Sequence, residues 1–243
     1  MTASSTTARP KTAMFLSRAR LRPDSSVQAI APLLLPEDGH ARLLAAHRLV
    51  WSLMSDDSGR TRDFLWREEQ PGAFLILAPR PADADSSLFD VDSKPWEPAL
   101  RTGDRLGFML RANPTVARGA GARMPGKQGL RGRRHDVVMD ALHDVAQAER
   151  AAARPEAMIA AGRRWLTQQG DRLGFAPDCD SLRIDGYDTV RIPRGREKSV
   201  EFGRLDFEGV MEVTDPAAFL AAVVAGFGRA RAFGCGMMLL RRA

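Results

Sequence analysis

The sequence predicts an α+β protein that consists of two ferredoxin-like units in tandem. Its 243 residues lie near the upper end for one domain and within the usual range for two. With 44% hydrophobic and 27% charged residues, the chain can bury a hydrophobic core, which excludes a wholly disordered protein. On either side of Asn113 and Pro114, the segments follow one order: strand, helix, strands, helix or irregular segment, strand.

Hydrophobic periodicity defines the elements of the first half. The expected elements are a strand at 14–19, a helix at 41–54, strands at 64–67, 73–77 and 104–111, and an irregular Asp-, Ser- and Pro-rich stretch at 81–98. Residues 14–19 alternate apolar and polar side chains, as in a strand with one buried face. In the expected helix, apolar side chains recur at helical spacing and share their face with His47.

Turn and cap residues define the elements of the second half. The expected elements are helices at 136–150 and 155–169, strands at 189–192, 199–202, 205–213 and 237–240, and a helix from 216 to 226. Pro155 and Pro216 each predict a helix start, because proline fits the first helical position. Asp215 is a suitable N-cap for the last helix, and Gly226 ends it.

These patterns divide the chain into a disordered N-terminal extension at 1–13, an N-terminal unit at 14–115 and a C-terminal unit at 116–243. No apolar stretch follows the basic residues of the extension, so it does not resemble a signal peptide. No run of about 18 apolar residues occurs, and no membrane contact is expected. Cys179 and Cys235 are too few for a disulfide framework or a zinc site, which favours a cytoplasmic location.

Positive charge is concentrated in two segments. The chain has 36 basic and 30 acidic residues, a net charge of +6 that favours a polyanionic partner such as nucleic acid. Residues 113–134 contain no acidic residue and six basic ones: Arg118, Arg123, Lys127, Arg131, Arg133 and Arg134. The expected hairpin loop at 193–198 adds Arg194, Arg196 and Lys198. Held on one surface, these charges neutralise RNA phosphates. The alternatives are a solvated linker and a solvated turn.

Four glycines follow the last expected helix: Gly226, Gly228, Gly234 and Gly236, with Arg229 and Arg231 between them. Such a segment allows the backbone to approach a phosphate closely. It is not a dinucleotide-binding fingerprint, because there the glycines lie between a strand and the following helix. The alternative is a helix C-cap followed by a tight turn.

His47 is the candidate for acid–base chemistry, because its usual pKa suits proton transfer at neutral pH. The alternative is a buried histidine whose ring nitrogens are satisfied within the core. The sequence has no HExxH, P-loop, GxSxG or cysteine-rich ligand set, so we expect no metal site and no cofactor.

The order of these features resembles the CasE (Cse3) family, the repeat endoribonucleases of type I-E CRISPR systems. The segments that carry the resemblance are MFLSRARL from 14, HRLVW from 47, RDFLWR from 62, KPWEP from 94, FMLRANP from 108, FEGV from 207 and the glycine segment 226–236. Together they extend over all but about the first thirteen residues.

The resemblance implies two tandem ferredoxin-like (RAMP) domains and metal-independent cleavage of a CRISPR repeat hairpin. In this reaction the 2′-hydroxyl attacks the adjacent phosphorus and leaves a 2′,3′-cyclic phosphate. His47 aligns with the family's catalytic histidine, and Lys127, Arg131, Arg133 and Arg134 correspond to its basic active-site segment. The implied partners are the precursor RNA and other Cascade subunits, with no DNA contact of the chain's own.

One position departs from the family pattern. Known members have a tyrosine three residues before the histidine, where this chain has Leu44, and its only tyrosine is Tyr187. The second proton-transfer role is therefore vacant, or it falls to His135, a basic side chain or water. Two other function classes stay open: a structural subunit that binds an RNA hairpin without cutting it, and, more distantly, a small-molecule enzyme that holds a nucleotide phosphate at the glycine turn.

Overall fold

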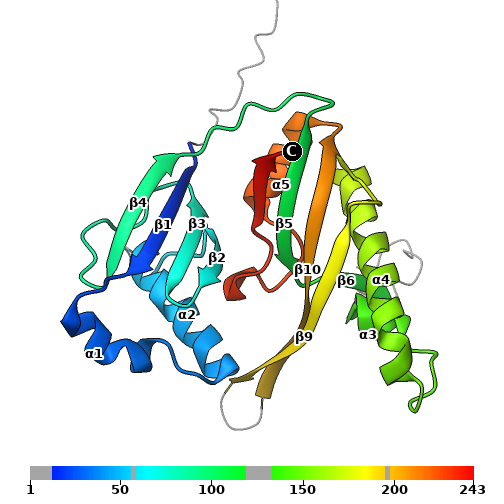
Figure 1. The fold of residues 1–243 in the computed structure, drawn as a ribbon, viewed down its shortest axis with the longest axis horizontal. Coiled ribbons are helices and arrows are strands. Elements are labelled where there is room, and N and C mark those ends of the chain that lie inside the picture. Colours follow the sequence, from blue (N-terminus) through cyan, green and yellow to red (C-terminus); the bar gives the residue numbers. More distant parts are fainter. Residues whose placement is uncertain (1–12, 56–58, 119–132, 195–197) are drawn as a thin grey trace, which may run out of the picture.

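The computed structural model describes residues 13–55, 59–118, 133–194 and 198–243, and the side chains of 133, 193, 194 and 198 lie outside the description. Helices are combined with two larger antiparallel sheets, which lie side by side (Figure 1). The α+β class is confirmed. The expectation of a disordered extension at 1–13 concerns residues that, apart from Ala13, are outside the described part of the chain.

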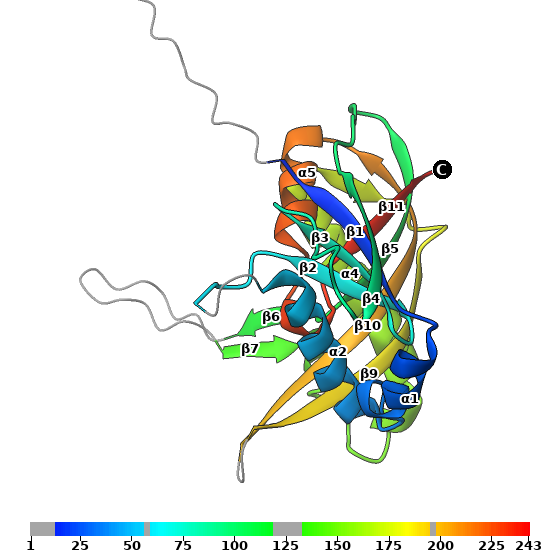
Figure 2. The same cartoon turned by 90° about the vertical axis from the view of Figure 1, so that its left-hand side faces the viewer.

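The first sheet has the strand order β2-β3-β1-β4. Its strands are β1 (Phe15–Leu21), β2 (Leu65–Gln70), β3 (Ala73–Ala78) and β4 (Phe89–Pro95). Helix α1 (Ser25–Leu34) and helix α2 (Gly39–Met54) connect β1 to β2. The Asp38 carboxylate caps α2 by accepting a hydrogen bond from the Ala41 N–H at 2.7 Å. Helix α2 covers one face of this sheet (Figure 2).

The second sheet has the order β11-β5-β10-β8, and β9 also pairs with β10. Its strands are β5 (Arg105–Ala112), β8 (Phe175–Pro177), β9 (Arg183–Arg194), β10 (Lys198–Val213) and β11 (Met238–Arg242). The helices of this half are α3 (Val137–Ala141), α4 (Arg150–Leu173) and α5 (Pro216–Ala225). A short ribbon of β6 (Thr115–Arg118) and β7 (Arg133–Asp136) projects from it.

Two strand expectations need correction. Residues 89–95, expected to be irregular, form β4, because they pair with β1 along its whole length. The second correction concerns 105–112, which we expected in the N-terminal unit. This strand, β5, pairs with β10 and β11 instead, so it belongs to the second sheet. The chain therefore passes from one sheet to the other between β4 and β5.

The helices also differ from expectation. Helix α1 was not expected, although Asp24 caps it through the Val27 N–H at 3.0 Å. The helix expected at 136–150 is only the short α3. Helix α4 begins at Arg150 rather than at Pro155, which lies in its second turn. Ala151, whose carbonyl loses its N–H partner at this proline, and Pro155 itself are both exposed, and an exposed helix end tolerates such a loss because water can bind the carbonyl.

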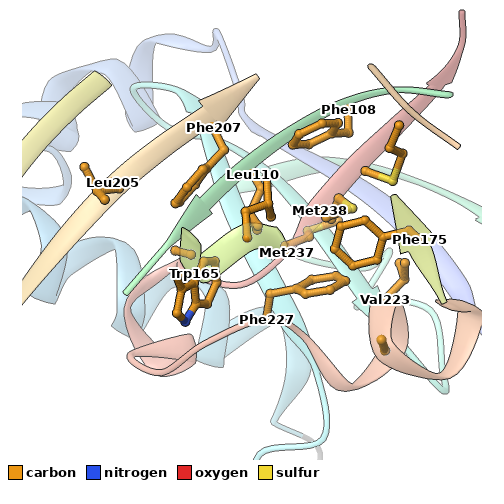
Figure 3. Packing of buried hydrophobic residues seen from close by; sticks show 14 of the residues in the cluster. Phe108, Leu110, Trp165, Phe175, Leu205, Phe207, Val223, Phe227, Met237 and Met238 are labelled. Atoms are coloured by element: carbon orange, nitrogen blue, oxygen red, sulfur yellow. The ribbon is translucent and has the colours of Figure 1, made fainter. Parts of the chain in front are cut away.

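The two sheets share one hydrophobic core. Strand β3 is buried at every position because both of its faces are covered. Phe74 and Ile76 pack into the core beneath α2. Leu75 and Leu77 point to the opposite face and join the core of the second sheet, which Figure 3 shows from close by. The first sheet is thus held rigidly against the second.

Truncation of Leu77 tests this shared core. Leu77→Ala should lower the free energy of unfolding by about 2–5 kcal/mol, because it leaves a cavity where the two halves meet. Equilibrium denaturation measures the change. Leu33 on α1 is 80% exposed, so Leu33→Ala should change the same quantity by less than about 0.5 kcal/mol. Equal effects of the two substitutions would contradict the shared core.

Candidate functional site

His47 lies on α2, half-buried, and its Nδ1 is 2.8 Å from the carbonyl oxygen of Ala232. Ala232 belongs to η1, a 3₁₀ turn at Arg231–Phe233 that follows α5. Because a carbonyl only accepts hydrogen bonds, Nδ1 must carry the proton. The Nε2 atom then keeps its lone pair and is free to accept a proton. A residue from one half of the molecule therefore sets the tautomer of a histidine in the other half.

Trp66 on β2 holds the same carbonyl in place. Its Nε1–H donates to the Ala232 oxygen at 3.2 Å, and the indole is 1% exposed. Gly234, next to the turn, has a φ of +74°, and a Cβ there would lie 3.2 Å from the Trp66 ring. Glycine thus allows the turn to lie directly on the indole. This packing positions the acceptor for His47.

The pKa of His47 is lowered. Burial of the imidazole is the largest cause, and the positive charges of Arg62 and Arg48 act in the same direction. The hydrogen bond to Ala232 opposes them without reversing the shift. At neutral pH the ring is therefore predominantly neutral, which is the form that a general base requires.

A groove of about 810 Å³ lies beside this turn. Its described lining includes five arginines and no acidic residue; the arginines are Arg62, Arg134, Arg172, Arg229 and Arg231. Arg62 lies in the loop before β2, Arg134 in the β6–β7 ribbon and Arg172 in α4, and the other two arginines follow α5. Only the tertiary structure brings these segments together. A surface of this kind binds phosphates.

A second groove adjoins the first, and the two share Arg134, Arg229 and Phe233 in their linings. Its other side is β10, which contributes Phe202. Asp136 also lines it; burial raises the pKa of this carboxyl group, and the Tyr187 hydroxyl donates to its Oδ1 at 3.1 Å. The two grooves together form one basic channel around η1.

The glycine segment adopts the turn that the sequence predicts. Gly226, Gly228, Arg229 and Arg231 line the first groove, whereas Gly234 and Gly236 are buried below it. Gly228 has a φ of +71°, and a Cβ there would lie 2.7 Å from the Asn113 carbonyl oxygen. The close approach that glycine allows here is to the protein's own backbone.

The basic segments are only partly placed. Arg134 lies in the channel, on β7. Lys127, Arg131 and Arg196 fall outside the described residues. Arg133, Arg194 and Lys198 have their backbone in β7, β9 and β10, but their side chains also lie outside the description.

The candidates for a second proton-transfer group lie elsewhere. Successive residues of a strand point to opposite faces, so His135 faces away from Arg134, into a separate hollow that it shares with His143. The Tyr187 hydroxyl is engaged by Asp136, and burial raises the pKa of this tyrosine to about 12. Leu44 is half-buried on α2, one helical turn before His47.

Sequence reasoning missed several residues that the structure places beside His47 or one contact away from it. They are Arg62, Trp66, Phe202, Ala232 and Phe233. Arg62 and Trp66 lie within a segment that carries the family resemblance, but nothing there indicated their role. The Ala232 contribution is a backbone carbonyl, which has no signature in a sequence. Within the described ranges, no three His, Cys, Asp or Glu residues gather as metal ligands do, and no helix there is long and apolar enough to cross a membrane.

Comparison with known proteins identifies the family. The family model described as CRISPR associated protein matches residues 14–242. The chain belongs to this family. Among the relatives of this CasE-type chain, the CRISPR-associated endoribonuclease Cse3 of Thermus thermophilus is 30% identical over 193 residues, which are 75% of this chain and 81% of the relative. The Cascade subunit CasE of Escherichia coli is 26% identical over 205 residues, or 82% of this chain and 91% of that protein.

Solved structures agree with this membership. A Cse3 endoribonuclease bound to a 19-nucleotide RNA superimposes with a TM-score of 0.62 at 25% identity, over 94% of this chain and 99% of that one. Cas6e from Escherichia coli shares the fold with a TM-score of 0.51 at 21% identity, over 94% of this chain and all of the other. Both the resemblance to the CasE (Cse3) family and the expected tandem ferredoxin-like fold are confirmed.

The electrostatic environment of His47 is testable by NMR titration. Arg62→Gln should raise the pKa of His47, because it removes a positive charge that disfavours the imidazolium ion. The native pKa should lie below the usual 6.5, and ¹⁵N shifts should report the Nδ1–H tautomer. Arg164→Gln, on the exposed part of α4, serves as the control and should leave the titration unchanged. A lower or unchanged pKa in Arg62→Gln would contradict the described environment.

The close contact of Gly234 with Trp66 can be tested by comparison with a second glycine of positive φ. Gly103 also has a positive φ, +89°, but a Cβ there would meet nothing within 4 Å. Gly103→Ala should therefore cost only backbone strain, about 1–2 kcal/mol. Gly234→Ala should cost more and should also shift the His47 resonances, because the added methyl group displaces the turn from Trp66. Denaturation and NMR measure both effects, and indistinguishable variants would show that this contact has no role in seating the turn.

Proposed function

We propose that this chain is a metal-independent endoribonuclease that cleaves CRISPR repeat hairpins in precursor RNA and so produces mature guide RNA. One observation carries the proposal: a neutral histidine contacts Ala232 and Phe233, two residues that line a groove with five arginines, and its Nδ1 is bound to the Ala232 carbonyl. Its relatives support this reading, since the Thermus protein is named an endoribonuclease and a matched Cse3 structure contains RNA.

In the proposed reaction, Nε2 of His47 accepts the proton of a ribose 2′-hydroxyl. The 2′-oxygen attacks the adjacent phosphorus, the bond from phosphorus to the 5′-oxygen breaks, and the 5′-oxygen takes up a proton from the imidazolium ion or from water. The products are a 2′,3′-cyclic phosphate and a 5′-hydroxyl. The arginines of the groove stabilise the negative charge that grows on the phosphate oxygens. This chemistry needs no metal-bound water, because the RNA supplies its own nucleophile.

The arginine-rich segments bind the stem of the hairpin. A-form RNA presents a deep, narrow major groove, so basic side chains contact its backbone more readily than its bases. Lys127, Arg131, Arg133 and Arg134 serve this purpose beside the cut, with Arg194, Arg196 and Lys198 at the β9–β10 hairpin and Gly226 to Gly236 at the turn. The proposed partners are the precursor RNA and other Cascade subunits, in the cytoplasm, with no DNA contact of the chain's own.

Leu44 favours a second candidate function. Without a tyrosine at this position, the chain binds the hairpin but cuts it slowly or not at all, and acts as a structural subunit. Both candidates require the same basic channel, so affinity does not separate them. Cleavage does.

The decisive experiment compares wild type with His47→Ala on a labelled repeat RNA in EDTA. Wild type should release a product that ends in a cyclic phosphate. His47→Ala should lower single-turnover cleavage at least about a hundredfold, because positioned acid–base catalysis contributes about 10²–10⁴ in rate. Its affinity for the hairpin should stay close to that of wild type, because many phosphate contacts carry the binding.

Each other outcome identifies an alternative. A folded His47→Ala protein that cuts at the wild-type rate removes His47 from the mechanism. RNA that is retarded but intact with wild type supports the structural subunit. RNA that is neither cut nor retarded excludes both candidates.

A further inference from the structure

Two phenylalanines of the basic channel are unusual for this protein. Of its eleven phenylalanines, eight are buried, and all eleven lie in the described part of the chain. Phe202 and Phe233 are partly exposed, and both line the second groove. They are its only described aromatic residues. Core packing alone does not account for aromatic rings at the surface of an arginine-lined channel.

The two rings form a stack that ends at the candidate catalytic histidine. Phe202 and Phe233 have centroids 5.7 Å apart and planes only 22° from parallel. Phe233 in turn contacts His47, with centroids 5.6 Å apart. Phe202 projects from β10 and Phe233 from η1, so two different elements hold the stack. A flat apolar surface of this kind, close to the reacting group, is suited to another planar ring.

The charges around the stack favour a nucleotide as the source of that ring. Arg134 and Arg229 line the same groove together with Asp136, whose pKa is raised by burial, and Glu201, and neither arginine forms an ion pair with any other described residue. An aromatic face flanked by free arginines binds the base and the phosphate of one nucleotide together. A base that is paired inside a stem already stacks on its neighbours, so the ring must come from an unpaired nucleotide.

We infer that Phe202 and Phe233 form a stacking platform for an unpaired nucleobase that flanks the scissile phosphate. This inference rests on the proposed function and names the part of the RNA that the second groove holds. Arg134 and Arg229 neutralise the adjoining phosphates. Stacking tolerates every base, so the platform sets the position of the strand rather than its sequence. The 2′-hydroxyl is thereby held in register with His47.

The test measures binding, so that it does not depend on cleavage. A repeat hairpin with a 2′-deoxynucleotide at the cut is prepared intact and with single abasic nucleotides at each unpaired position near the cut. Affinities are measured for wild type, Phe202→Ala and Phe202→Tyr. Phe202→Ala should bind intact RNA about 5- to 100-fold more weakly, as expected for one lost base–aromatic stack. Phe202→Tyr keeps the ring and should stay within about threefold of wild type.

The abasic series separates stacking from packing. At one flanking position, the abasic RNA should bind wild type more weakly and should no longer distinguish Phe202→Ala from wild type. Val116→Ala removes exposed apolar surface outside both grooves, and it should bind every RNA as wild type does. Melting curves check that each variant is folded.

Three results would overturn the inference. In the first, Phe202→Ala weakens every abasic RNA by the same factor as intact RNA, which means that the ring only supports Phe233. In the second, Phe202→Ala binds intact RNA as tightly as wild type does. In the third, no abasic position near the cut weakens binding to wild type, a result that does not depend on any variant. If wild type does not bind the hairpin at all, the proposed function fails as well, so the two failures are distinguishable.

Discussion

The site depends on burial of the first sheet on both faces. One face packs under α2, and the other, through Leu75 and Leu77, enters the core of the second sheet. A sheet that is covered on one side only would leave its unit free to move against its neighbour. Here the shared core fixes the distance between α2 and the turn at η1. His47 and Ala232, 185 residues apart in the chain, therefore meet at hydrogen-bond distance.

The residues that orient the His47 ring differ from the residues that supply the positive charge of the channel. The Ala232 carbonyl accepts hydrogen bonds from His47 and Trp66, and the glycine at 234 allows the turn to lie on the indole. These contacts fix which ring nitrogen carries the proton, and they are supplied by backbone and buried side chains. The arginines stand at the surface, where they attract phosphate. Burial also lowers the pKa of His47, so one arrangement sets both the orientation and the protonation state of this imidazole.

The two faces of the β6–β7 ribbon border different hollows, because successive side chains of a strand point to opposite faces. Arg134 points into the channel, while His135 points to the hollow on the other side. The alternation of side chains in a strand requires this separation. It directs His135, which the sequence analysis named as one possible second proton-transfer group, away from the channel. On β10, both Phe202 and the exposed Glu201 line the second groove.

The sequence by itself determined the α+β class, most elements with strong periodicity and the turn at the glycines, and it indicated His47 as the candidate for acid–base chemistry. Local patterns carry this information, because periodicity and caps depend on neighbours in the chain. It did not determine that 105–112 pairs within the second sheet or that 89–95 is a strand, because pairing depends on partners distant in the chain. Only the tertiary structure assembled Arg62, Arg134 and Arg229 into one channel and brought a backbone carbonyl to His47. A carbonyl is present in every residue, so its role is decided by where the fold places it.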